Sequence, residues 1–283
     1  MKLPNFFIAG APKAGTDLLY YQLDQHPQIL MSPLKEPNYF ADEIRPDNFH
    51  PSLRLIADRG VASMRPYLDS GMLARRFGGI VTDIEDYCRL FASADQQRAV
   101  GEGSVCYLWS RSAASRIADL VPHARVIIVL MDPAERAFHQ YLKSLSDGTV
   151  AHPFARHLDL AFGDRSKSPS QIRLFNPFLA FGEYAEQLDR YLEHFPREQL
   201  LISLYEDTQD NYDRWFTDVL RFLGVDSSFR PPAVDVPSAP HLPPDIPEPR
   251  MYPVDRARLV AFYRSNILRL QSVLGRDLSN WLN

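Results

Sequence analysis

The residues with the clearest chemical purpose lie within the first twenty positions. The apolar run Phe6-Phe7-Ile8-Ala9 is followed by a turn that reads Gly10-Ala11-Pro12-Lys13-Ala14-Gly15-Thr16-Asp17. A turn of this kind between a strand and a helix directs successive backbone N–H groups at one point, and the helix N-terminus adds about half a positive charge there. We therefore expect residues 11–17 to bind an anion such as a phosphate or sulfate group.

The lysine of this turn stands in an unusual place. The spacing of Gly10 and Gly15 equals that of the phosphate-binding loop of nucleoside triphosphatases, but Thr16 follows the second glycine where those enzymes have lysine. The only lysine of the turn is Lys13, in its middle. We interpret the turn as a variant anion-binding loop in which Lys13 supplies the positive side chain.

Further motifs follow this loop along the chain. They read Lys35-Glu36-Pro37-Asn38-Tyr39-Phe40, Gly101-Glu102-Gly103-Ser104, Asp132-Pro133-Ala134-Glu135-Arg136-Ala137-Phe138, and a tail from Arg250-Met251-Tyr252-Pro253 to Leu274-Gly275-Arg276-Asp277-Leu278. In this order the segments resemble the sulfotransferase family, in particular its bacterial and heparan-sulfotransferase-like branch. The resemblance spans nearly the whole chain.

The resemblance implies transfer of a sulfuryl group from 3′-phosphoadenosine 5′-phosphosulfate (PAPS) to a hydroxyl or amine of a small-molecule acceptor. Lys13 and the N–H groups after it would stabilise the leaving phosphate. Glu36 matches the family's general base, and Glu102 stays open as an alternative base or as a group that orients one. The cofactor-binding residues that the resemblance implies are Ala11, Pro12, Lys13, Ala14, Gly15, Thr16, Asp17, Arg136, His139, Arg250 and Tyr252.

Four positions depart from the family pattern, and each departure weakens attraction for an anionic nucleotide. Met131 and His139 replace an arginine and a serine that contact the 3′-phosphate, and a lost charge-assisted contact is worth about 1.5–3 kcal/mol. Asp17 replaces a threonine, and a carboxylate about 5 Å from a phosphate repels it by roughly 3 kcal/mol at an effective dielectric constant near 20. Gly103 replaces a lysine. Arg136, His139 and the basic tail residue Arg250 are candidates to compensate for these losses.

These departures leave three functions open. A sulfotransferase with weakened or relocated recognition of the 3′-phosphate is preferred. The second is an enzyme on the same scaffold that uses a different anionic donor, with Asp17 holding a ribose hydroxyl or a cation. The third is a non-catalytic descendant that binds a ligand or a partner, since a retained fold does not guarantee retained chemistry.

Short apolar runs alternate with amphipathic stretches, which predicts an α/β fold: a P-loop-like three-layer arrangement with a central parallel sheet flanked by helices. The predicted strands cover residues 6–10, 99–102, 126–131 and 200–205. The predicted helices cover residues 113–120, 134–145, 178–194, 212–223 and 253–274, besides one that follows the first loop. The proline-rich residues 230–249 predict an extended strap without helix.

Composition bounds the remaining properties. A length of 283 residues with 45% hydrophobic content fits a single domain over residues 1–283. The net charge of −4 argues against a nucleic-acid partner. Cys88 and Cys106 are too few for a disulfide framework and predict two reduced, buried thiols. No apolar stretch reaches the ~20 residues of a membrane span, so we expect a cytoplasmic protein, and we expect no metal site.

Acceptor recognition is expected on variable segments over the edge of the sheet, at residues 41–83 and 149–176. These segments combine aromatic side chains with basic ones, which suit an aromatic or an anionic acceptor equally. The aromatic residues are Phe49, Tyr67, Phe154, Phe162 and Phe175, and the basic residues are Arg54, Arg65, Arg75, Arg156, Arg165, Lys167 and Arg173. The sequence does not determine the oligomeric state.

Overall fold

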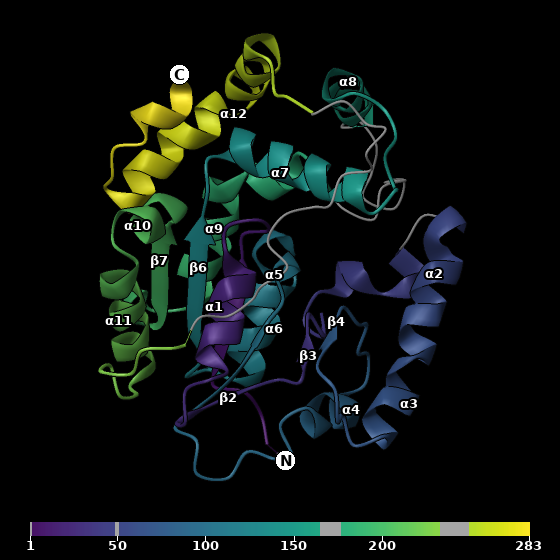
Figure 1. Ribbon diagram of the computed structural model, residues 1–283, viewed down its shortest axis with the longest axis vertical. Coiled ribbons are helices and arrows are strands. Elements are labelled where there is room, and N and C mark those ends of the chain that lie inside the picture. Colours follow the sequence, from purple (N-terminus) through teal and green to yellow (C-terminus); the bar gives the residue numbers. More distant parts are fainter. Residues whose placement is uncertain (1, 49–50, 165–176, 233–248) are drawn as a thin grey trace.

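A five-stranded sheet forms the centre of the molecule (Figure 1). The computed structural model describes residues 2–48, 51–164, 177–232 and 249–283. The strands of the sheet are β1 (Phe6–Gly10), β2 (Ile29–Met31), β5 (Ala99–Gly103), β6 (Arg125–Leu130) and β7 (Leu200–Leu204). Their order is β2-β5-β1-β6-β7, and every neighbouring pair is parallel. The predicted central parallel sheet is confirmed.

The central strand β1 is buried along its whole length, because helices cover the sheet on both faces. A continuous apolar run is the pattern that such a strand requires. Its neighbour β5 carries glycines at positions 101 and 103, and Gly101 lies directly against the ring of Phe6. The close approach of β1 and β5 therefore depends on the absence of a side chain at position 101.

Helices lie on both faces of the sheet because successive connections between strands run in opposite directions across it. The connection from β1 to β2 runs one way and those from β5 to β6 and β7 run the other, so right-handed crossovers place their helices on opposite faces. Helix α1 (Thr16–Leu23) packs on β1, β2 and β5, with α11 (Tyr212–Leu223) beside it. The other layer contains α5 (Cys106–Trp109), α6 (Ala113–Leu120), α7 (Pro133–Ser146) and α9 (Tyr184–His194) (Figure 1).

Helix α12 (Pro253–Leu274) packs on α9 and α7 and completes this layer. The bounds of α6, α11 and α12 agree with the prediction. The helix predicted over residues 178–194 begins only at Tyr184, because residues 180–182 form a separate 3-10 turn. Gly182 in that turn fits so closely against Tyr263 and Pro133 that a side chain there would clash with both.

Residues 41–83, predicted as variable loops, are instead largely structured. They contain two 3-10 turns (Asp42–Ile44 and Pro46–Asn48), α2 (Pro51–Ala62), α3 (Met64–Asp69) and β4 (Arg76–Phe77), and α4 (Ile84–Arg89) follows. Strand β4 pairs in parallel with β3 (Leu34–Lys35). These elements are short, and few of their described side chains are apolar and buried, among them Ala57, Met64 and Leu68, so their sequence periodicity is weak.

The second predicted acceptor segment contains helix α8 (Phe154–Asp164). Residues 165–176 of this segment, with Arg165, Lys167, Arg173 and Phe175, lie outside the described residues. Phe49 and residues 233–248 of the predicted strap lie outside them too. Helix α10 (Tyr205–Asp210) follows β7 directly.

The two cysteines agree with the prediction. Cys88 and Cys106 are both buried and unpaired. Among the helices of the described residues, none combines the length and the apolar character that a bilayer crossing needs.

The packing of β5 on β1 generates a stability prediction. A Cβ at position 101 would lie 2.3–2.5 Å from three ring atoms of Phe6, whereas one at position 103 would meet its nearest atoms at 3.6 Å. We expect Gly101→Ala to lower the free energy of unfolding by about 1–3 kcal/mol, as overpacked substitutions do. Gly103→Ala in the same strand is the matched control and should cost less than about 0.5 kcal/mol. Chemical denaturation measures both, and equal losses would contradict this account of the sheet.

Candidate active site

The turn between β1 and α1 leaves several backbone donors available. Lys13 and Gly15 adopt left-handed conformations, with φ of 71° and 79°. The Ala11 N–H donates to the Val129 carbonyl (2.6 Å) and that of Ala14 to the Ala11 carbonyl (3.2 Å). Within the described part of the chain, the N–H groups of Lys13 and of residues 15–17 donate to no other group. These four donors lie at the positive end of α1, where an anion would satisfy them, and the anion site there stays a prediction.

The side chain of Lys13 lies near this turn without a hydrogen-bond or ion-pair partner among the described residues. Burial lowers the pKa of Lys13, and the charges of Lys143 and Lys35 act in the same direction, whereas Asp17 and Glu36 oppose them. Contact with an anion stabilises an ammonium that is partly desolvated and unpaired. The predicted role of Lys13 as a ligand for the anion stays a prediction that this environment favours.

One aromatic residue of the loop's surroundings was missed by sequence reasoning. Tyr205 follows β7, and a Cβ on Gly15 would lie 3.3 Å from its ring. Its position at the end of a predicted strand could have identified it, because side chains just beyond the carboxyl ends of parallel strands gather at one edge of the sheet.

The structure corrects the expected repulsion by Asp17. Its carboxylate lies 2.6 Å from the ammonium of Lys35, whose side chain is only 2% exposed. The negative charge is therefore compensated, and the expected penalty of roughly 3 kcal/mol for an unpaired carboxylate does not apply. Sequence reasoning missed this pair because the two residues are eighteen positions apart.

Glu36 directly follows β3 and lies close to this pair. Its backbone adopts a left-handed conformation (φ 62°), and its N–H donates to the Gly103 carbonyl (2.9 Å). The Asn38 amide donates to the carbonyls of Glu36 and Gly79, both at 2.9 Å. The Glu36 carboxylate lies 3.4 Å from the ammonium of Lys35 and also acts electrostatically on Lys13. The structure thus brings the predicted base and the predicted anion site together.

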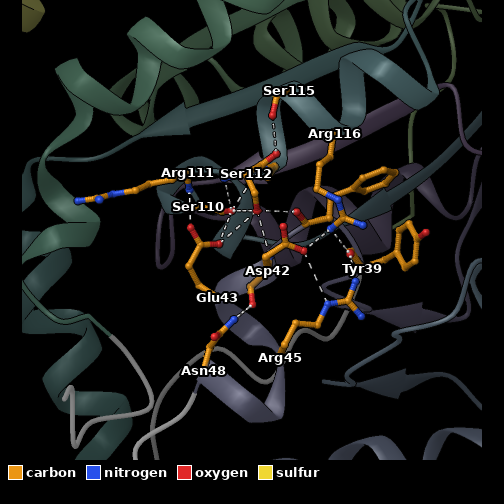
Figure 2. A network of polar contacts seen from close by, with 12 residues as sticks. Tyr39, Asp42, Glu43, Arg45, Asn48, Ser110, Arg111, Ser112, Ser115 and Arg116 are labelled. Carbon is orange, nitrogen blue, oxygen red and sulfur yellow. Dashed lines mark hydrogen bonds and ion pairs between the residues drawn. The ribbon is translucent and has the colours of Figure 1, made fainter. Parts of the chain in front are cut away.

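A polar network fixes residues 39–48, which follow Glu36, to the residues around the start of α6 (Figure 2). The Glu43 carboxylate accepts hydrogen bonds from the Ser110 hydroxyl (2.6 Å) and the Arg111 N–H (2.7 Å). Arg116 donates to the Tyr39 carbonyl and to Asp42, both at 2.9 Å. Residues 39–48 are therefore tied to the start of α6, which limits movement of the turn that carries Glu36.

Glu102 does not face a ligand. It is fully buried in β5, where its carboxylate accepts hydrogen bonds from the hydroxyls of Tyr107 (2.6 Å), Ser104 (2.7 Å) and Tyr87 (2.9 Å). Burial raises the pKa of Glu102 to about 7, although these hydrogen bonds oppose the shift. Its expected role as a base that contacts the acceptor is corrected by this burial. The Ser104 hydroxyl also accepts a hydrogen bond from the backbone N–H of Asn38 (3.2 Å). Through Ser104, Glu102 therefore supports the turn that carries Glu36.

The predicted role of Arg136 in cofactor binding is also corrected, because its side chain is buried. Its side chain is inaccessible to solvent, and its guanidinium donates to Gln140 and to the Phe178 carbonyl. Met131 at the end of β6 is 4% exposed. The arginine that was expected to compensate for Met131 therefore holds the interior of the layer that contains α7, and it is not free to bind a phosphate.

His139 is the predicted cofactor residue on α7 whose imidazole is accessible. Partial desolvation and the charge of Lys13 both lower the pKa of His139, which places it on the same side as the loop. Tyr252 is 61% exposed and precedes α12, which packs on α7 and α8. Arg250 is exposed just before it. The cofactor roles of His139, Arg250 and Tyr252 stay predictions.

The buried carboxyl generates a pH prediction. Glu102 keeps its proton up to about pH 7 when folded, whereas an unperturbed glutamate loses it near 4.5. Between these values the folded protein binds more protons, so its stability falls as pH rises. Relative to Glu102→Gln, we expect the wild-type free energy of unfolding to decrease by about 3 kcal/mol from pH 5 to pH 8. Denaturant titrations at both pH values measure this, and a constant difference would contradict the assignment.

Comparison with known proteins adds independent evidence on the family. The model of the sulfotransferase family matches residues 4–229. The chain is 31% identical over 228 residues to bifunctional heparan sulfate N-deacetylase/N-sulfotransferase 3 of Homo sapiens, covering 79% of this chain and 22% of that protein. It is 26% identical over 335 residues to carbohydrate sulfotransferase 15 of Homo sapiens, covering 99% of this chain and 54% of that protein. The chain thus spans only part of the length of these relatives.

A solved structure shows the same likeness over the full length. The crystal structure of a sulfotransferase from Alicyclobacillus acidocaldarius superposes with a TM-score of 0.77 and 31% sequence identity, covering 100% of both chains. The chain belongs to the sulfotransferase family.

Proposed function

We propose that this protein transfers a sulfuryl group from PAPS to a hydroxyl or amine of a small-molecule acceptor. The observation that carries the proposal is the loop at residues 11–17, where four backbone donors and the ammonium of Lys13, without an ion-pair partner among the described residues, lie beside Glu36. A sulfuryl transfer needs an anion site for the leaving phosphate and a base for the acceptor's proton. This site offers both within a chain of the sulfotransferase family.

The donor, when bound, supplies a sulfuryl group attached to a phosphate leaving group. Lys13 and the N–H groups of residues 15–17 bind the phosphate and stabilise the negative charge that it gathers as the sulfur–oxygen bond breaks. Glu36 accepts the proton that the acceptor oxygen or nitrogen loses as its new bond to sulfur forms. The ring of Tyr205 lies close enough to Gly15 that a Cβ there would meet it at 3.3 Å, so this ring borders the loop.

Recognition of the 3′-phosphate is weaker than the family pattern predicts. Arg136 is buried and Met131 carries no donor, so His139 is the main candidate for this contact. The same observation favours a second candidate function, transfer from an anionic donor that lacks the 3′-phosphate. The two donors differ in the 3′-phosphate, so binding measurements with nucleotides that have and lack this group distinguish them.

We propose a small molecule as the acceptor, and the alternative is a carbohydrate, which is suggested by the names of the two human relatives. The exposed ring of Phe77 in β4, opposite Lys35, is suited to contact an apolar or ring-shaped part of either acceptor. A panel of small alcohols, amines and saccharides with labelled donor distinguishes the two classes.

The assigned roles predict different kinetic effects for two substitutions. Lys13→Ala should reduce kcat about 100- to 1000-fold with a modest loss of nucleotide affinity, because the lysine acts mainly on charge that develops during transfer. Glu36→Gln should reduce kcat about 100-fold or more and leave nucleotide affinity unchanged. Steady-state kinetics and calorimetry with adenosine 3′,5′-bisphosphate measure both. Glu85→Gln, an exposed carboxylate on α4, is the control, and near wild-type rates in the first two variants would end the assignment.

Restoring the family arginine tests the donor. Met131→Arg should tighten binding of adenosine 3′,5′-bisphosphate about tenfold without changing the affinity for adenosine 5′-monophosphate, since only the former carries the 3′-phosphate. Met131→Leu is the size-matched control. Equal wild-type affinity for the two nucleotides and no gain in the arginine variant would favour the second candidate donor. Binding of neither nucleotide would favour a non-catalytic protein.

A further inference from the structure

The ammonium of Lys35 occupies a singular position between the two halves of the proposed site. It lies 2.6 Å from the Asp17 carboxylate on the first turn of α1 and 3.4 Å from the Glu36 carboxylate at the end of β3. Asp17 belongs to the turn that supplies backbone donors for the anion, and Glu36 is the proposed base. One buried positive charge thus contacts a residue of each half.

The surroundings of Lys35 hold this charge in place. Its side chain is 2% exposed, and its ammonium lies 4.7 Å from the ring centre of Phe77 and 6.0 Å from that of Tyr20. A buried ammonium is unfavourable unless it is paired, so the two carboxylates are required for burial. Burial acts to lower the pKa of Lys35, but Glu36 and Asp17 outweigh it and raise the pKa above its ordinary value, so the side chain stays charged.

The backbone alone does not determine where the Glu36 carboxylate points. Hydrogen bonds from its N–H to Gly103 and from Asn38 to its carbonyl hold the turn, but neither reaches the carboxylate. Within the described residues, the one hydrogen bond that this carboxylate accepts comes from the ammonium of Lys35. Its ammonium is in turn anchored on Asp17.

We infer that Lys35 is a positioning residue that couples the anion-binding turn to the base, and that Asp17 is the anchor that makes this coupling possible. This inference rests on the proposed function. It assigns Asp17 a use at the position where the family pattern has threonine: the carboxylate brings no attraction for the donor, but it fixes the ammonium that orients Glu36.

Replacing Asp17 by asparagine separates positioning from simple structural support. The variant removes a negative charge beside the anion site and also releases Lys35 from its anchor. We therefore expect Asp17→Asn to bind adenosine 3′,5′-bisphosphate about three- to tenfold more tightly, an effect that shrinks at high salt, and to lose about tenfold in kcat. Opposite changes in affinity and turnover are not the result of a merely destabilised fold. Wild-type kcat in this variant would overturn the inference.

Replacing Lys35 by methionine tests the other side of the pair. Lys35→Met should lower both kcat and nucleotide affinity about tenfold, because it removes the contact to Glu36 and leaves Asp17 uncompensated. Adding Asp17→Asn to this variant should restore nucleotide affinity to within about threefold of wild type and leave kcat low. Recovery of kcat in the double variant would overturn the inference.

A matched control lies at the opposite end of the same helix. Asp24 pairs with Arg75 at the C-terminal end of α1, so Asp24→Asn removes the same charge from the same helix away from the turn. It should change neither affinity nor kcat by more than about twofold. A wild-type protein that neither binds the nucleotide nor transfers sulfate would refute the proposed function. In that case a double-mutant cycle for Asp17 and Lys35 in thermal unfolding still tests the pair, and zero coupling would overturn the inference.

Discussion

Backbone N–H groups at the start of a helix need acceptors, and within the described residues those of Lys13 and of residues 15–17 have none. This unsatisfied set of donors is the constraint around which the site is built. The left-handed conformations of Lys13 and Gly15 produce it, and the parallel strands place it at the edge of the sheet where the other loops also begin. An anion at this position satisfies the donors and the ammonium of Lys13 together.

Charge compensation explains why an acidic residue is tolerated in that turn. Asp17 would repel an anion if it were unpaired, but the buried ammonium of Lys35 neutralises it at 2.6 Å. The same ammonium contacts Glu36, so the two carboxylates nearest the turn share one positive charge. Among the described residues, Lys13 has no hydrogen bond or ion pair to these carboxylates, although the charges of Asp17 and Glu36 act on its pKa. The two lysines of the site therefore differ: Lys35 is paired inside the protein, and Lys13 is not.

The carboxylates are divided in a similar way by burial. Glu36 is 19% exposed beside Lys35, whereas Glu102 is enclosed by three hydroxyl groups in the core. Burial raises the pKa of Glu102 to about 7, so its interaction with the hydroxyls changes near neutral pH. Its link through Ser104 to the Asn38 N–H joins the core to the turn that carries Glu36. Glu36 and Glu102 have the same side chain, and it is their surroundings that make one carboxylate partly accessible and the other buried.

The sequence by itself determined the features that depend on local pattern: the four strands it predicted for the central sheet, the bounds of α6, α11 and α12, and the glycine-containing turn between the first strand and the first helix. It did so because a buried strand requires a continuous apolar run and a helix terminus requires particular residues within a few positions. The short strand β2 and the short helices of residues 41–83 escaped prediction, since three to twelve residues that bury few side chains leave little periodicity.

Only the tertiary structure decided which side chains meet. The pairing of Asp17 with Lys35, the burial of Arg136 and Glu102, and the contact of Tyr205 with Gly15 all join segments that are distant in sequence or set a depth that packing controls. A motif states which charges are present in a segment. Whether a given charge faces a ligand, a counter-ion or the core depends on the layers that close over it, because solvation and distance set the energy of a charge.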